Sequence, residues 1–239
     1  MPTPSGFEQN PSSRYGVVRA CRTLKELPDW TPVLRRPWWL GGLLALHLMA
    51  AGEVVCALGA GAPSYNGYQD QRPTGDAMQL AGDINNALRS VCQPRCPQIA
   101  IFRNATAPNA MLVVGNNGDA KIVYAPQFFT AIYDGYGDGA ILVVIAHLFG
   151  HALDETTAAP WSKPLGSPEL RADAWAGCAL ARTNLTARGL QETLAAASKY
   201  PPVARVSWDQ RVTALRLGYT QCGGEGTKFD AAGSTRKRQ

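Results

Sequence analysis

Residues 141–154, ILVVIAHLFGHALD, combine a long apolar run with two of the three histidines in the chain. The side chains from Ile141 to Ile145 are apolar all round a helix, which is typical of a helix buried in a core. His147 and His151 are four residues apart, so on a helix their imidazoles lie on the same face. The stretch therefore predicts a buried helix whose two histidines can reach one metal ion.

Two acidic residues further along the chain complete a possible zinc site. Glu169 lies eighteen residues beyond His151, at the start of the next expected helix, and Asp173 follows it one helical turn later. A zinc ion takes about four ligands, so we expect Glu169 as the third ligand and a water as the fourth. Asp173 is expected to accept a hydrogen bond from a ligating histidine. The alternative is that both histidines are ordinary core residues.

The two motifs resemble those of a known family of enzymes. A-H-x-x-G-H-A-x-D at 146–154 and E-L-R-A-D-A-W-A-G at 169–177 are similar to the gluzincin zinc metallopeptidases, especially the HtpX-like family and the bacterial neutral zinc metallopeptidases. In that family H-E-x-x-H supplies two ligands and a general base, and E-x-x-x-D supplies the third ligand and its supporting carboxylate. The resemblance covers roughly residues 97–222.

The resemblance implies a function and further site residues. It implies peptide hydrolysis by zinc-activated water, with an extended peptide paired to an edge strand, either 110–114 or 120–124. Arg211, in the segment WDQRV, matches an arginine that supports the family's site. No histidine follows His151, so Tyr200 or Tyr219 is the candidate for stabilising the oxyanion.

Leu148 occupies the position of the family's general base. A leucine cannot accept a proton from zinc-bound water, and general acid–base assistance contributes about 10²–10⁴ in rate. The chain is therefore predicted to be an inactive or strongly impaired zinc peptidase, either by nature or as a variant of an active enzyme. Asp154 or Glu155 standing in as the base remains open. The alternative function is a zinc-stabilised module that binds peptides or proteins without cutting them.

The N-terminal region reads as a leader rather than as part of the fold. Residues 1–36 are rich in Pro, Ser and Arg and are expected to be disordered. Residues 37–62 carry a short apolar run after two arginines and end in an A-x-A pattern, which predicts a secretory signal. The alternative is a retained membrane anchor over 37–60. Cys56 lacks the preceding small residues of a lipoprotein signal, so lipidation is not predicted. Export to the periplasm or the outside is expected.

Cysteine usage agrees with export. Removal of the leader takes away Cys21 and Cys56 and leaves an even number, Cys92, Cys96, Cys178 and Cys222. We expect two disulfides and favour the pairs Cys92–Cys96 and Cys178–Cys222 among the three possible pairings. The net charge is +5, but the basic residues are scattered except in the tail at 236–238. Binding to nucleic acid is therefore not predicted.

The pattern of the remaining residues predicts one α+β domain over 63–226, with a small sheet that includes antiparallel strands, packed helices and a zincin-like metal helix. Residues 227–239 are expected to be a basic tail. Asp138 is expected to cap the metal helix, and Ser167 and Pro168 to start the next one, which is expected to run to about Thr186. Ser207 with Gln210 is expected to form a capping box that starts a last helix, to about Tyr219. The other expected elements are helices over 74–91 and 126–133, a strand over 98–103, and a hairpin of 110–114 with 120–124 around Asn117-Gly118.

Overall fold

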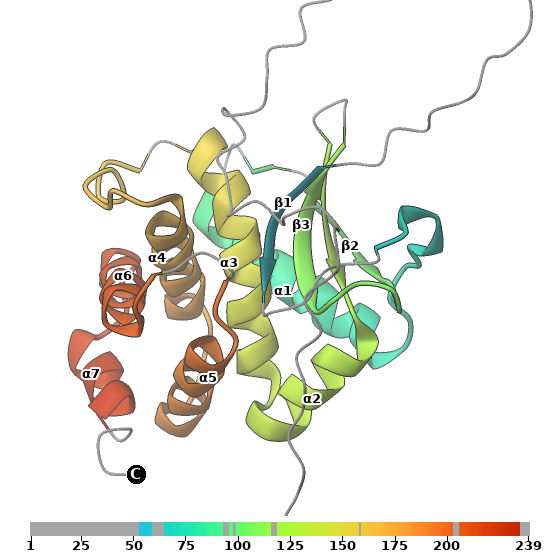
Figure 1. Ribbon diagram of the computed structural model, residues 1–239. Helices are drawn as coiled ribbons and strands as arrows, with labels where there is room; N and C mark the ends of the chain where they lie inside the picture. The colour runs from blue at the N-terminus through green and yellow to red at the C-terminus, as the bar shows by residue number, and fades with distance from the viewer. Residues whose placement is uncertain are drawn as a thin grey trace, which may run out of the picture.

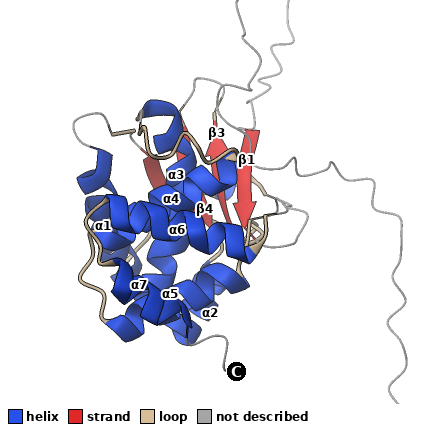
Figure 2. Cartoon of the chain, turned by 90° about the vertical axis from the view of Figure 1, so that its left-hand side faces the viewer, coloured by secondary structure: helices blue, strands red, loops and turns tan. Residues whose placement is uncertain are grey.

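The computed structural model describes residues 53–58, 65–92, 96–97, 99–115, 119–157, 159–202 and 206–234. It confirms the expected α+β class: a four-stranded mixed sheet packs against helices (Figure 1). Seen from the helical side, the strands lie behind the helices (Figure 2). The predicted leader 1–36, most of the segment 37–62, the Asn117-Gly118 turn and the basic run 236–238 lie outside the described residues.

The sheet has the strand order β1-β3-β4-β2. Strands β3 (Ala110–Val114) and β4 (Ala120–Tyr124) pair antiparallel, as the Asn-Gly signal predicted, and β2 (Ile99–Arg103) pairs parallel with β4. Strand β1 (Glu53–Leu58) pairs antiparallel with β3 and was not predicted, because its residues fall in the segment taken as a signal or anchor. The structure makes this part of the segment a strand of the sheet.

The strands expected to receive a peptide are interior. β3 is paired on one side with β1 and on the other with β4, and β4 is paired with β3 and β2. The expectation that 110–114 or 120–124 offers an edge for an extended peptide is therefore wrong for the sheet that the structure describes. Its edges are β1 and β2.

The helices follow the predicted order with four differences. Helix α2 runs to Tyr136, so Gly137, at φ 74°, separates it from α3, and Asp138 lies in the first turn of α3 instead of capping it. The helix that starts at Ser167 and Pro168 ends at Ala181, and a separate helix, α5, follows. The fourth difference concerns the predicted tail at 227–239. Most of α7 (residues 226–234) lies in it, and this helix buries Phe229. The helices are α1 (Asp76–Cys92), α2 (Pro126–Tyr136), α3 (Asp138–Thr156), α4 (Pro168–Ala181), α5 (Ala187–Lys199), α6 (Trp208–Gln221) and α7 (Gly226–Ser234), with a 3₁₀ turn η2 (Gly67–Gln69).

Helix α3 is the centre of the core. It lies between the sheet and the helices α4 and α5 (Figure 1), and every residue from 139 to 153 is buried. On length and composition it is apolar enough to cross a membrane, but 83% of its most apolar window is buried inside the domain. Because protein surrounds α3 on every side, all of its faces are apolar.

Glycines bring α4 into backbone contact with its two neighbours. A Cβ on Gly150 of α3 would lie 2.6 Å from the carbonyl oxygen of Ala172. On the other side of α4, a Cβ on Gly177 would overlap the backbone of Leu215, and one on Gly218 would overlap the backbone of Ala174. These crossings flank Asp173, so they set how closely α4 holds that side chain to α3 and α6.

Replacing Gly218 with alanine is expected to lower the free energy of unfolding by about 1–3 kcal/mol, because the added methyl must push α6 away from Ala174. Gly82→Ala in α1 is the matched control, since nothing lies within 4 Å of a Cβ there. It should stabilise by about 0.5–1 kcal/mol, because glycine is a poor helix former. Urea denaturation of both variants measures the difference, and equal changes would mean that α4 and α6 are not in close contact.

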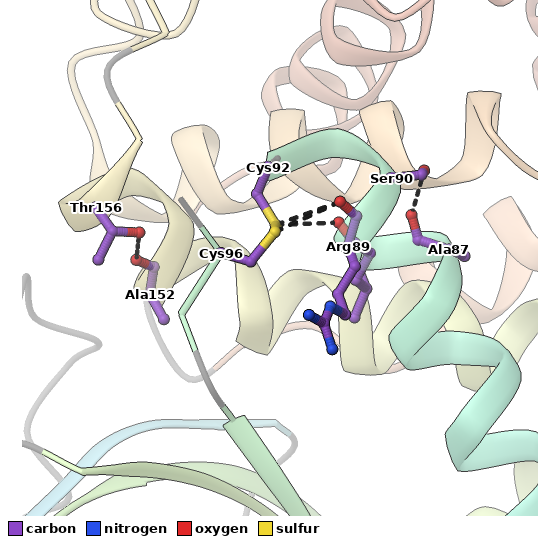
Figure 3. The surroundings of a disulfide bond; sticks show 8 residues. Ala87, Arg89, Ser90, Cys92, Cys96, Ala152 and Thr156 are labelled. Carbon is purple, nitrogen blue, oxygen red and sulfur yellow. Dashed lines mark hydrogen bonds between the residues drawn. A yellow bond between two sulfur atoms is a disulfide. The ribbon is translucent and has the colours of Figure 1, made fainter. Parts of the chain in front are cut away.

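Both favoured disulfides are present. Cys92–Cys96 closes a short loop at the end of α1, and Figure 3 shows it in one view with the last turns of α3. Cys178–Cys222 joins α4 to the residue that follows α6, across 44 positions of sequence. The prediction of these two pairs is confirmed.

Candidate metal centre

Four buried side chains from three parts of the fold meet at one point. His147 and His151 come from adjacent turns of α3, Glu169 from the first turn of α4, and Cys56 from β1. One ligand atom from each lies within 4.8 Å of every other, and the four residues are only 0–3% exposed. The group could hold a metal ion, and it includes all three ligands expected from the sequence.

The nitrogen and oxygen donor atoms of His147, His151 and Glu169 lack hydrogen-bond partners. The Nε2 atoms of both histidines and both carboxylate oxygens of Glu169 are buried without a hydrogen bond. Glu169 Oε2 lies 3.3 Å from His147 Nε2 and 3.7 Å from His151 Nε2, close enough for ionic contact but without hydrogen-bond geometry. A tetrahedral zinc ion with bonds of about 2.0–2.1 Å separates neighbouring ligand atoms by about 3.3 Å. The residues therefore fit a bound metal ion.

Asp173 and Arg211 form a buried network with the candidate ligand His147. Asp173 Oδ1 lies 2.8 Å from His147 Nδ1, which places a proton on Nδ1 and leaves Nε2 for a metal. Arg211 donates to both oxygens of Asp173, from Nε at 2.8 Å and from Nη2 at 3.0 Å, and its Nη1 donates to the carbonyl of Ala197 at 2.7 Å. Helices α3, α4, α5 and α6 are thereby joined through one buried network.

The electrostatics are those of a site arranged around a cation. Burial alone lowers the pKa of His147, but Asp173 and Glu169 outweigh it and raise this pKa to about 9. Burial raises the pKa of Glu169, yet its contacts with His147 and His151 bring it down to about 2. Burial also disfavours ionised Asp173, whereas His147 and Arg211 hold its pKa below the ordinary value. Without a metal, protonated His147 provides the positive charge that these carboxylates require.

The general-base position offers no proton acceptor. Leu148 is fully buried, and it belongs to the hydrophobic core. Asp154, one possible substitute, accepts a hydrogen bond from Arg171 Nε at 2.7 Å. Glu155 lies in the last turn of α3 and is partly exposed. Neither of these acidic residues is in the group that the structure gathers around the ligand atoms.

The two tyrosines considered for the oxyanion are held by other aromatic rings. Tyr200 packs edge-on against Phe128, with ring centroids 5.1 Å apart. Tyr219 packs against Phe229 of α7 at 5.3 Å, and burial raises its pKa. Both rings therefore pack against aromatic residues that are not metal ligands. The oxyanion role stays a prediction.

Cys56 is the site residue that the sequence analysis missed. Its neighbours read as an export signal, so the residue was assigned to a segment expected to be removed. The pairing of β1 with β3 is irregular between Val54 and Cys56, and such a bulge changes the direction of the side chain that follows it. Cys56 also takes part in a disulfide. No local sequence pattern predicts that Cys56 lies near the histidines, because the pairing of β1 with the rest of the sheet brings it there.

The candidate ligands do not line the pocket that lies beside α3. A pocket of about 580 Å³ lies between α1, α2 and the first half of α3, with Ile84, Phe129, Ile141 and Ile145 among its lining residues. None of the four candidate ligands lines it. All four are buried, so protein covers their donor atoms.

Comparison with known proteins does not place the chain in a family. No protein-family model, no curated protein and no solved structure matches it, so its function has to be inferred from the geometry of the site itself.

Proposed function

We propose that this chain is a zinc-binding protein on a peptidase-like scaffold, and that its metal centre stabilises the fold instead of hydrolysing peptides. One observation carries the proposal: four donor atoms are buried without partners beside Leu148, a residue that cannot move a proton. Two imidazoles and a carboxylate are ligands that zinc takes in proteins. Bound zinc would supply a Lewis acid, and its binding energy would add to the stability of the fold.

The residues around the centre favour a structural role for the ion over a catalytic one. Asp173 and Arg211 fix the ring of His147, and the glycine crossing at Gly150 sets the distance from α3 to Glu169's helix. β1 pairs with β3 and all four candidate ligands are buried, so an extended substrate cannot add to β3 at the site. Protein covers a structural zinc site in this way, whereas a catalytic one must admit a substrate to the metal.

A second candidate is a zinc peptidase silenced at one residue. The spacing of His147, His151, Glu169 and Asp173 favours it, because it matches that of the peptidases named above and the structure brings all four together. In this case a peptide ligand would approach the site after β1 had moved, or would add to β1 or β2 at the sheet edges.

An exported location also remains a proposal. Two disulfides within the described residues are typical of an oxidising compartment. Cleavage after residue 62 would remove β1 and Cys56. The strand therefore fits better with a segment that stays attached to the domain, as the anchor alternative requires.

Metal content and peptidase activity test the proposal together. We expect about one equivalent of zinc in the purified full chain, and no chelator-sensitive cleavage of unfolded protein substrates. Leu148→Glu restores a carboxylate next to His147, and Leu148→Gln is its uncharged control of the same shape. Cleavage by the Glu variant alone would favour the silenced peptidase.

Two outcomes would contradict the proposed function. Chelator-sensitive cleavage by the unmodified chain would show that another group acts as the base. A protein that binds no zinc, even after chelator removal and reloading, would make His147 and His151 ordinary core residues.

A further inference from the structure

The proposed centre leaves the fourth ligand position to be assigned, and the structure brings a sulfur atom to it. The Cys56 Sγ atom is within 4.8 Å of the donor atoms of His147, His151 and Glu169. The side chain is 0% exposed, so it is closed to bulk solvent like the other three residues of the group. Its companions Glu169 and His151 have buried atoms without hydrogen-bond partners, and these point independently to a ligand at the same place.

The backbone directs this side chain inward. A bulge in β1 lies between Val54 and Cys56, and β3, the neighbouring strand, is buried at all of its positions. Bulges next to functional sites commonly re-aim one side chain. At the same time the Cys56 sulfur takes part in a disulfide, and a disulfide sulfur carries no thiolate charge with which to bind a metal.

We infer that Cys56 is a redox-controlled ligand: its thiolate completes the metal centre after reduction of the Cys56 disulfide, and oxidation withdraws it. The inference rests on the proposed zinc centre and deepens it. In the oxidised form His147, His151 and Glu169 hold the ion and leave one position open. In the reduced form the set becomes one sulfur, two nitrogens and one carboxylate oxygen, a closed set that zinc accepts.

The chemistry of the switch balances with a dithiol as the reductant. The dithiol gives two electrons and two protons to the disulfide, the S–S bond breaks to two thiols, and the dithiol becomes a cyclic disulfide. The Cys56 thiol then loses its proton to solvent as its sulfur binds. The thiolate and the Glu169 carboxylate together neutralise a divalent ion, while Asp173 is already paired with Arg211. The closed site therefore has no net charge to bury.

Cobalt(II) can report the sulfur directly, because a cobalt–thiolate bond gives a charge-transfer absorption that nitrogen and oxygen ligands do not. The full chain is metal-depleted, divided into an oxidised and a reduced sample, freed of reductant without air, and titrated with cobalt. We expect the absorption only in the reduced sample, with an affinity at least about tenfold higher, since even supporting residues of a metal site contribute 10–100-fold.

Cys56→Ser treated in the same way is the matched control. Reduction opens Cys92–Cys96 and Cys178–Cys222 in that variant too, so any general effect of reduction appears in both proteins. The variant should bind cobalt with the same affinity in both states and without the sulfur absorption. The same absorption in the reduced variant would assign it to another cysteine and overturn the inference.

The remaining outcomes separate this inference from the proposed function. Cobalt bound by the reduced unmodified chain without a sulfur absorption would remove Cys56 from the centre and leave His147, His151 and Glu169 in place. Cobalt bound by neither form would overturn the metal centre itself.

Discussion

Replacing Arg211 with methionine is expected to lower the free energy of unfolding by about 3–5 kcal/mol, because it takes an ion-pair partner and two hydrogen bonds from the buried Asp173 carboxylate, which then has only His147 beside it. The guanidinium makes three hydrogen bonds, two to Asp173 and one to the carbonyl of Ala197, and it is 3% exposed. Methionine fills much of the volume with a flexible apolar chain. The loss therefore reports the charges and hydrogen bonds more than a cavity. Urea denaturation in the presence of a chelator keeps metal binding out of the measurement.

The same helix provides the control for this prediction. Arg216 of α6 also makes a two-pronged contact, with Asp230 at 2.6 and 2.8 Å, but the two side chains are 46% and 54% exposed. Water and salt screen an exposed pair, so Arg216→Met should change the stability little. If both variants lost the same stability, the buried network would not be what joins α4, α5 and α6.

Replacing His151 with leucine is expected to have a large effect on zinc affinity and a small one on the stability of the metal-free chain. Structural zinc sites contribute about 10–16 kcal/mol, or roughly 3 kcal/mol for each of four ligands, so zinc affinity should fall at least about 100-fold. In a chelator, however, the variant should stay within about 1 kcal/mol of the stability of the unmodified chain. Leucine removes a buried Nε2 atom without a hydrogen-bond partner, which favours folding, but it also removes the contact that lowers the pKa of Glu169, which opposes it.

Chelator competition measures the affinity, and urea denaturation with and without zinc measures the stability. Ile145→Val, on the same buried helix, is the matched control. It should lose about 0.5–1.5 kcal/mol of stability in either condition and keep its zinc affinity. An affinity of His151→Leu within a few-fold of the unmodified chain would exclude this histidine from the metal centre.

The sequence predicted the structure best where residues within a few positions of one another decide the geometry. Ser167 accepts a hydrogen bond from the Glu169 amide, and Ser207 with Gln210 forms the full capping box, as predicted. The i,i+4 spacing placed His147 with His151, and Glu169 with Asp173, on shared helical faces. These signals act within a few residues of chain, so distant parts of the fold do not change them.

The wrong predictions arise where a local sequence signal conflicts with contacts between residues far apart in the chain. Residues 53–58 follow an apolar run with basic residues before it, so they read as an export signal, although β3 pairs with them as a strand. Asp138 is a good capping residue, but α2 continues to Tyr136 and Gly137 takes the cap position. α5 was missed because its cap, Thr186, was counted as the end of the preceding helix. The Cys56 position depends on all of the sheet pairing and has no local signature.

The Cys178–Cys222 bond also has a consequence for the unfolded chain. It closes a loop of 44 residues, which removes about 4 kcal/mol of conformational entropy from the denatured ensemble. The loop contains Arg211, and it starts five positions after Asp173. An unfolded oxidised chain therefore keeps these two charges within a short tether, so their contact can re-form early during refolding. Reduction would release the tether and slow that encounter.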